Sequence, residues 1–287
     1  MHRLARAAQR VLPCLLALGA SPAWAAPAVE GAVRLASHRA VYDLSLGSSG
    51  GTRAIDNASG RIVIDFRGDP CRGYTMQTRQ VTVLESGENG ARTSDLRNTT
   101  FESGDGRELR FKTTTLMNGA PSASVDGTAA VSNEGIRVSL KEPKRDQFKA
   151  PGDVVLPSDH MRRLVQAARA GQTTLSLKVF DGSDDGRKVY DTLAVIGRQV
   201  TAPATGERDK PLKEGALAGM PHWPVRLSYF TQGEGERTPI YTLVFDLYEN
   251  GVSGALTLDY GDFAIKGDMT RLDMEPDGVK PEAACTP

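Results

Sequence analysis

The chain has 287 residues, with 35 basic and 35 acidic side chains and a hydrophobic content of 39%. A formal charge of zero with 24% charged residues excludes a disordered polyelectrolyte. It also argues against nucleic-acid binding, because such proteins carry clustered positive charge. The length suffices for one or two domains that bury a core without covalent staples.

Residues 1–25 have the pattern of a secretory signal peptide. Three arginines and no acid precede a short apolar run at 11–20, and an Ala-Trp-Ala cleavage motif ends at Ala25. The apolar run is too short to span a bilayer, and no later run is longer. We therefore predict cleavage near Ala25, export to the periplasm, and a soluble mature chain that forms one domain over residues 26–287.

Removal of the leader changes the cysteine count. Cys14 lies within the leader, so Cys71 and Cys285 remain. An even count in an oxidising compartment favours one disulfide between them, although the residues alone also allow two unrelated thiols or a bond to another chain. Neither a zinc site nor a redox motif is indicated, because these need clustered ligands or a Cys-x-x-Cys pair.

The first half of the mature chain alternates between apolar and polar residues with the period of β-strands. The predicted strands there cover residues 41–46, 61–67, 74–84, 99–102, 109–115 and 136–140. Asp105-Gly106 separates two of them, which is typical of a hairpin turn. The pattern predicts antiparallel strands, each with one buried face.

One helix is predicted, over residues 159–170. Met161, Leu164, Val165 and Ala168 recur at helical spacing, Pro157-Ser158-Asp159 offers a turn and an N-cap, and Gly171 is placed to end the helix. Three turns are too short to be stable alone, so we expect the helix to pack on a sheet.

Strands resume after the helix. They are predicted at residues 174–180, 189–196, 225–230, 240–247, 252–260 and 263–272, with a loop over 201–221. Asn250-Gly251 is the strongest hairpin signal in the chain. About a dozen strands is many for a flat sheet, so the residues predict an all-β fold with a sheet that curls or closes and one central helix against its concave face.

No pattern of catalytic residues stands out. The mature chain has three histidines, His38, His160 and His222, and no nucleophile motif or nucleotide-binding glycine motif. The acidic turn at 181–186 matches the first half of a calcium loop but lacks its final glutamate, so a polar hairpin turn is the favoured interpretation. Aromatic residues gather in the last third, which we interpret as core or cross-strand pairs and not as a ligand cage. We predict a non-enzymatic protein without cofactor or metal.

Several segments in a fixed order resemble one known family. They are LASHRAVYDL at 35–44, VFDG at 179–182 followed by KVYDT at 188–192, WPVRLSYF at 223–230, LYENGV at 247–252 and LDYGDF at 258–263. This set is similar to the cell-envelope integrity protein B (EipB) family of alphaproteobacterial periplasmic proteins, and the resemblance covers nearly the whole mature chain.

The resemblance implies a spiral-like, broken β-barrel of roughly 14 antiparallel strands with one or two helices. It also implies a disulfide between an early strand region and the C-terminal tail, where Cys71 and Cys285 stand, and a role in envelope integrity and stress resistance. It implies no catalytic residues. We expect binding of another envelope component such as an envelope protein or lipoprotein. The alternatives are a lipid or lipoprotein carrier using the concave sheet face and, third, an envelope-polymer hydrolase.

Overall fold

The structure is a computed structural model that describes residues 33–275 apart from 51–54, 88–89, 203–207 and 234. The predicted signal peptide and Cys285 lie outside the described residues. In the described part of the chain no helix is both long and apolar enough to cross a membrane.

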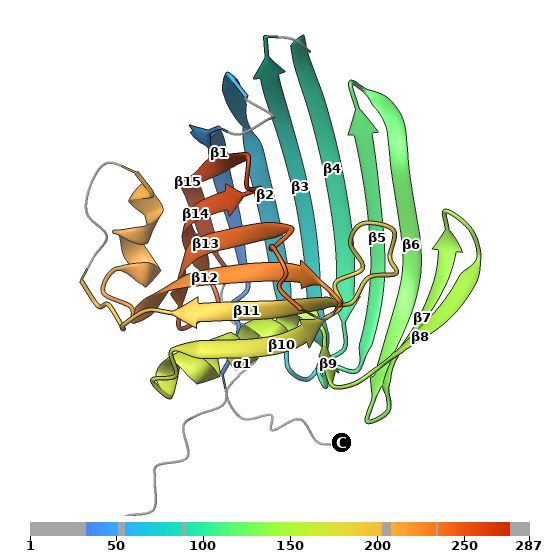
Figure 1. Cartoon of the computed structure of the whole chain (residues 1–287). Coiled ribbons are helices and arrows are strands. Elements are labelled where there is room, and N and C mark those ends of the chain that lie inside the picture. Colours follow the sequence, from blue (N-terminus) through green and yellow to red (C-terminus); the bar gives the residue numbers. More distant parts are fainter. Residues whose placement is uncertain (1–32, 51–54, 88–89, 203–207, 234, 276–287) are drawn as a thin grey trace, which may run out of the picture. The chain divides into compact units, whose positions relative to one another are not determined.

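The predicted β-rich fold with one α-helix is confirmed (Figure 1). In chain order the strands are β1 (His38–Ser49), β2 (Asn57–Asp69), β3 (Gly73–Ser86), β4 (Gly90–Glu102), β5 (Glu108–Met117), β6 (Ala120–Ser132), β7 (Gly135–Glu142), β8 (Asp146–Pro151), β9 (Val154–Val155), β10 (Thr174–Val179), β11 (Tyr190–Ile196), β12 (His222–Thr231), β13 (Tyr241–Tyr248), β14 (Ser253–Asp259) and β15 (Phe263–Met274). The helices are α1 (Pro157–Arg169) and two short 3₁₀ turns, η1 (Lys210–Leu212) and η2 (Gly215–Leu217). The sequence missed β6, β8, β9 and most of β4. β4, β6 and β8 contain few large apolar residues, and β9 has only two residues.

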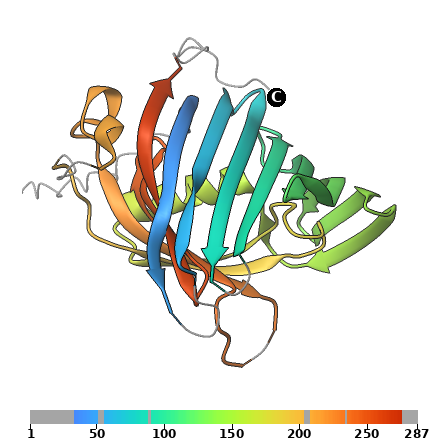
Figure 2. The same cartoon turned by 90° about the horizontal axis from the view of Figure 1, so that it is seen from above.

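All these strands belong to one sheet of 15 strands, in the order β8 to β1 followed by β15 to β9. The first and last strands pair with each other, so the two halves of the chain lie on either side of them. The sheet curls until β10–β14 cross in front of β1–β6 (Figures 1 and 2). The result is a nearly closed barrel with one unsealed seam, as the curled pattern predicted.

The seam lies between β8 and β9, which are neighbours in the chain but stand at opposite edges of the sheet. β9 pairs with β10 in parallel, whereas every other pair of strands in the described residues is antiparallel. Parallel neighbours need a crossover connection, and α1 provides it between β9 and β10. The helix therefore sits where the sheet opens.

Side chains fill the seam where backbone hydrogen bonds are missing. After β10, residues 180–189 turn onto β5–β7, and the Phe180 ring meets the Phe111 ring edge-on at 5.5 Å. A Cβ added at Gly182, whose φ is +72°, would lie 2.5 Å from Phe111, so only glycine allows this approach. Arg187 forms an ion pair with Asp146 of β8. The two sheet edges are thus joined by packing and one ion pair.

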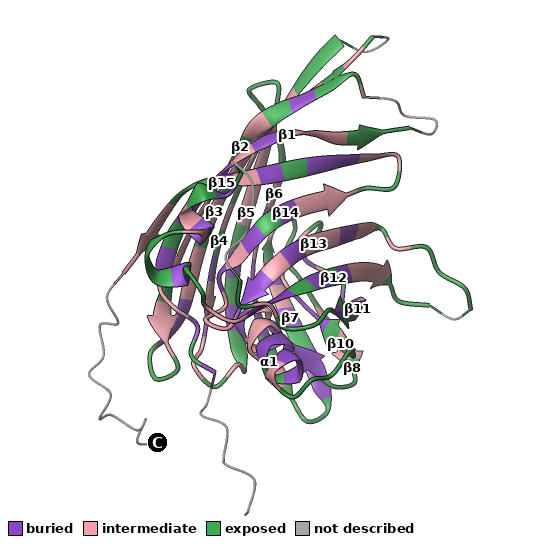
Figure 3. Ribbon diagram, turned by 90° about the vertical axis from the view of Figure 1, so that its left-hand side faces the viewer, coloured by how far each residue is buried: buried purple, intermediate pink, exposed green. Residues whose placement is uncertain are grey.

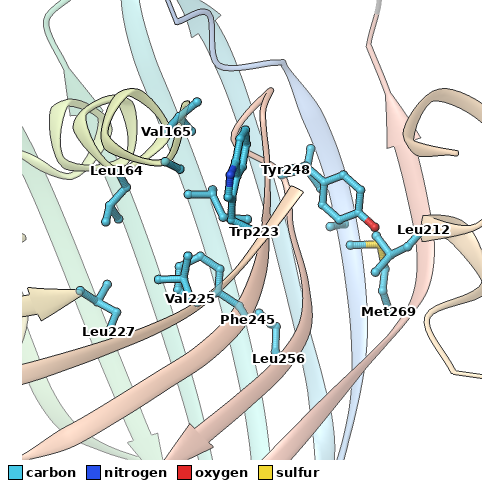
Figure 4. Packing of buried hydrophobic residues seen from close by; sticks show 14 of the residues in the cluster. Leu164, Val165, Leu212, Trp223, Val225, Leu227, Phe245, Tyr248, Leu256 and Met269 are labelled. Atoms are coloured by element: carbon cyan, nitrogen blue, oxygen red, sulfur yellow. The ribbon is translucent and has the colours of Figure 1, made fainter. Parts of the chain in front are cut away.

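The main core lies between α1 and the inner face of β11–β15 and β1–β3 (Figure 4). Leu164 and Val165 of α1 are fully buried near Trp223 and Val225 of β12 and Phe245 of β13. Buried and exposed residues alternate along strands such as β12, whereas α1 carries a wide buried face (Figure 3). The predicted packing of the helix against the concave face is confirmed.

The start of α1 differs from the prediction. The helix begins at Pro157 with Leu156 as the N-cap residue, and no side chain of the Pro157-Ser158-Asp159 turn caps it. Glu102 at the end of β4 does so instead, accepting hydrogen bonds from the backbone N–H groups of Ser158 at 2.6 Å and Asp159 at 3.1 Å. The cap comes from a distant strand, so local sequence could not reveal it. Gly171 ends the helix with φ of +70°, as predicted.

Candidate functional site

A row of aromatic rings crosses the inner face of the barrel. The Tyr229 and Tyr241 rings stack with centroids 4.5 Å apart, and Tyr190 meets Tyr229 edge-on at 6.1 Å. On the other side Tyr260 lies 6.5 Å from Tyr241 and stacks on Phe263 at 5.1 Å. We call these five residues the aromatic row. It runs from β11 across β12 and β13 to the β14–β15 turn.

The register of the strands creates this row. Tyr229 of β12 and Tyr241 of β13 are directly opposite each other, and aromatic cross-strand pairs stabilise antiparallel strands. Leu227 lies two residues before Tyr229, and Leu243 lies two residues after Tyr241. Residues two apart in a strand point to the same face, and both leucines pack in the core, so the tyrosine rings stand on the inner face. Tyr229 and Tyr241 are nevertheless only half-buried, and Tyr260 is 41% exposed. Solvent therefore reaches the row at these residues, whereas Tyr190 at its end is buried.

Uncharged polar side chains make up most of the middle of the inner face of β3–β5, with Leu96 among them. Gln80 and Thr78 of β3 stand opposite the inward-pointing Ile62 and Ile64 of β2, which sets their orientation. The same face continues through β4 and β5. We call the following residues the polar wall: Thr78, Gln80, Thr82, Ser94, Asn98, Thr113 and Thr115.

Most of the charge on these strands lies on the other face, although the buried Glu102 and the exposed Arg92 of β4 share the inward alternation. Arg79, Asp95 and Arg97 alternate with the polar wall and form ion pairs with one another on the outside of the sheet. Inside, Asn98 donates a hydrogen bond to the Thr113 hydroxyl at 2.8 Å, and Gln80 donates one to Thr82 at 3.1 Å. The polar wall is therefore a neutral surface of hydroxyl and amide groups.

The aromatic row and the polar wall meet. The Gln80 side chain lies close enough to the phenol of Tyr260 to lower its pKa, although burial raises that pKa by more. These residues belong to β3 and to the β14–β15 turn, which the curl of the sheet brings together. A molecule lying on the row is therefore within reach of the wall.

The tyrosine phenols of the row keep their protons at neutral pH. Burial raises the pKa of the Tyr229 phenol and of the Tyr241 phenol, and these two phenols hydrogen-bond each other. The Asp181 carboxyl lies close enough to raise both pKa values further. Burial also raises the pKa of Asp181. At neutral pH the phenols are therefore hydrogen-bond donors and not phenolate nucleophiles.

Comparison with known proteins identifies the family. The profile of the EipB-like family matches residues 29–276 of this chain. The chain belongs to the EipB-like family. It is 35% identical over 262 residues to the cell envelope integrity protein EipB of Brucella abortus (strain 2308), covering 91% of each chain. The crystal structure of a β-barrel-like protein of the DUF1849 domain from Brucella abortus matches with a TM-score of 0.79 and 36% identity, over 85% of this chain and all of that one.

The acidic turn at 181–186 lies at the seam of this EipB-like chain. The Asp181 carboxylate accepts a hydrogen bond from the Ser183 backbone at 2.9 Å. Asp184 binds the Lys188 ammonium and the Tyr190 hydroxyl, and Asp185 accepts the Arg187 backbone N–H. Each carboxylate is engaged in its own local contact. Among the described residues no group of three or more His, Cys, Asp or Glu side chains could hold a metal ion.

The three histidines of the predicted mature chain, His38, His160 and His222, lie apart and are all buried. The His38 ring bonds the Ala36 carbonyl oxygen at 2.8 Å, and the His222 ring bonds that of Met220 at 3.1 Å. Burial lowers the pKa of His160 to about 4, and the charge of Arg163 adds to this effect. Within the described part of the chain none of the three rings hydrogen-bonds a serine hydroxyl or a carboxylate.

Cys71 stands in the exposed turn between β2 and β3, and its backbone N–H bonds the Asp69 carboxylate at 2.8 Å. It lines a pocket of about 670 Å³ together with Arg72, Phe101 and Arg107. Because Cys285 lies outside the described residues, the disulfide between the two cysteines stays a prediction.

Sequence reasoning missed the arrangement of side chains on the inner face. The aromatic residues were interpreted as cross-strand pairs, which they are, but their solvent exposure depends on how far the sheet curls. The polar wall had a visible signal in β3, where Thr78, Gln80 and Thr82 alternate with Arg79 and Val81. Nothing in that alternation indicates which side is inside.

Proposed function

We propose that this chain is a non-enzymatic periplasmic protein that maintains envelope integrity by binding another envelope component. Its relationship to the envelope integrity protein of Brucella supports the envelope role, and the leader pattern of residues 1–25 supports export. The observation that carries the binding role is the solvent-accessible aromatic row beside a neutral polar wall. Aromatic surface with a few hydrogen-bonding groups is typical of sites that bind ligands.

The composition of the inner face favours binding over catalysis. A hydrolase needs an activated nucleophile or a general acid–base pair within hydrogen-bond distance. The phenols of the row have raised pKa values, so they are poor bases at neutral pH. They are well suited to donate stable hydrogen bonds to a bound molecule.

The lipid-carrier alternative fits the inner face less well. An acyl chain needs a continuous apolar surface, whereas the polar wall presents hydroxyl and amide groups along three strands. Covering these groups with hydrocarbon would remove them from water without giving them hydrogen-bond partners, which costs free energy for each group. The helix α1 and residues 180–189 at the seam also occupy much of the apolar interior.

Deletion of the gene tests the proposed function. We expect the deletion strain to be more sensitive to detergent and to cell-wall antibiotics, and we expect the full chain to restore resistance. A variant that lacks residues 2–25 should not restore it, because it stays in the cytoplasm. A deletion strain as resistant as its parent, or full rescue by the variant without the leader, would show that the proposed function is wrong.

A further inference from the structure

We propose that the aromatic row and the polar wall together bind a neutral oligosaccharide, such as the glycan part of an envelope polymer. This inference rests on the proposed function, since it names the class of component that the inner face binds. It requires three properties of the surface: aromatic rings in the row for stacking, hydroxyl and amide groups in the wall for hydrogen bonding, and no charged side chain among the wall residues.

The row provides the stacking surface. A sugar ring has flat faces of C–H groups, and these pack against the faces of aromatic side chains while its hydroxyls point outward. Consecutive rings of the row lie between 4.5 and 6.5 Å apart. Within the stacked pairs Tyr229–Tyr241 and Tyr260–Phe263 the rings cover part of each other's faces. A sugar therefore packs against the ring surface that stays exposed, which is largest at Tyr260. The pairs are joined through Tyr241 and Tyr260, so the row is longer than one sugar ring. A chain of sugars fits such a surface better than a monosaccharide does.

The wall provides the hydrogen bonds. Each sugar hydroxyl both donates and accepts, and so does each serine, threonine, asparagine or glutamine side chain. Thr78, Ser94 and Thr115 point to the inside and are half-buried, and their hydroxyls bond no other described group of the protein. These three hydroxyls are available to a ligand. The amides of Gln80 and Asn98 stand beside them and suit the acetamido groups of N-acetylated sugars.

The absence of charge on the wall excludes other ligand classes. Phosphate and carboxylate ligands are recognised by Arg and Lys side chains, but on β3–β5 Arg79, Arg97 and Lys112 all point outward. Arg92 follows the inward alternation, but it stands opposite Leu84 at the end of the wall. Two carboxyls lie near the row, that of Asp181 and that of Asp184, which accepts the Tyr190 hydroxyl, and both would repel an anion when ionised. A neutral, hydroxyl-rich molecule matches both surfaces.

Calorimetric titration of the mature chain, residues 26–287, with tri-N-acetylchitotriose and with lysozyme-solubilised peptidoglycan tests this inference. We expect binding of one or both at micromolar to millimolar concentration. Tyr260→Ala should weaken it about tenfold, because stacking on one aromatic ring contributes about 1–3 kcal/mol in the related case of nucleobases. Gln80→Ala should weaken it about threefold. Tyr260 is 41% exposed, so its loss should leave the fold intact, which the melting temperature verifies.

Ile240→Ala is the matched control. Ile240 precedes Tyr241 and is 40% exposed, but it lies outside the row, so its replacement should not change binding. No heat with either saccharide at millimolar concentration would overturn the inference. So would equal affinity of Tyr260→Ala and the unmodified chain. Binding of palmitate or of a lipoprotein that is lost in Tyr260→Ala, without saccharide binding, would also overturn it.

Complementation separates this inference from the proposed function. If Tyr260→Ala is exported and stable but fails to restore resistance, and saccharides do not bind, the envelope role stands and the ligand class is wrong. If the deletion strain has no phenotype, the envelope role fails whatever the titration gives. Saccharide binding that depends on Tyr260, with loss of rescue in the same variant, supports both.

Discussion

Replacing Glu102 should detach the start of α1 from the sheet. Glu102 is 2% exposed and accepts the backbone N–H groups of Ser158 and Asp159 at 2.6 and 3.1 Å. Glu102→Ala leaves both donors without a partner. A buried donor without a partner costs about 1–3 kcal/mol, and the Asp159 N–H is closer to solvent than that of Ser158. We therefore expect a loss of about 3 kcal/mol in the free energy of unfolding.

Thermal unfolding by circular dichroism measures this loss. For a domain of this size 1 kcal/mol corresponds to about 2–4 °C, so the melting temperature of Glu102→Ala should fall by roughly 6–12 °C. The scan belongs at pH 8 and not at acidic pH, because burial raises the pKa of Glu102 and a higher pH favours the ionised carboxyl that accepts both N–H groups. Glu102→Gln keeps one acceptor oxygen and should lose about half as much.

Glu108 offers the control on the same hairpin. It is exposed, and its replacement by alanine should change the free energy of unfolding by less than about 0.5 kcal/mol. If Glu102→Ala melts no lower than Glu108→Ala, the long-range cap does not hold the helix. In that case the buried face of α1 alone would account for its docking.

Three further predictions concern packing at the seam, the loss of stability at acidic pH and the predicted disulfide of Cys285. Gly182→Ala should lower the free energy of unfolding, measured in urea, by about 2–4 kcal/mol, because alanine disfavours a positive φ and its Cβ would clash with Phe111. Gly261 also has a positive φ but open space around it, so Gly261→Ala should lower that free energy by only about 1 kcal/mol. Equal losses would contradict tight packing at the seam. The pKa of His160 is lowered from 6.5 to about 4, so the folded state binds fewer protons in that interval. About 3 kcal/mol of stability should be lost as the pH falls through it, and His160→Gln should show a smaller loss over the same interval. If Cys285 pairs with Cys71, Cys285→Ser or a reductant should lower the free energy of unfolding by up to about 5 kcal/mol and lower the melting temperature with it. An unchanged melting temperature under reduction would refute the disulfide.

The helix shows how far local pattern extends. Leu164, Val165 and Ala168 recur at the spacing of one helical face, and all three are buried in the structure. That spacing is a property of the chain itself, so the prediction was confirmed. The start of the helix depends on Glu102, more than 50 residues earlier, and no local pattern contains that contact.

The inner face shows the opposite case. Tyr229 and Tyr260 were visible as aromatic residues near strand ends, and Gln80 was visible as part of an alternating strand. Their convergence requires both the register of β12–β15 and the curl that brings β3 towards the β14–β15 turn. Each strand specifies two faces, but which face turns inward is decided by the whole sheet.

The amino-acid sequence by itself determined the β-rich class, the single helix and the family, because these depend on residue periodicity and on the order of short segments. Only the tertiary structure decided where the sheet stays open and which side chains line its interior. The seam between β8 and β9 exists because β1 pairs with β15, a contact between the two ends of the described chain. The aromatic row and polar wall face each other for the same reason, since pairing of the end strands is what closes the sheet around them.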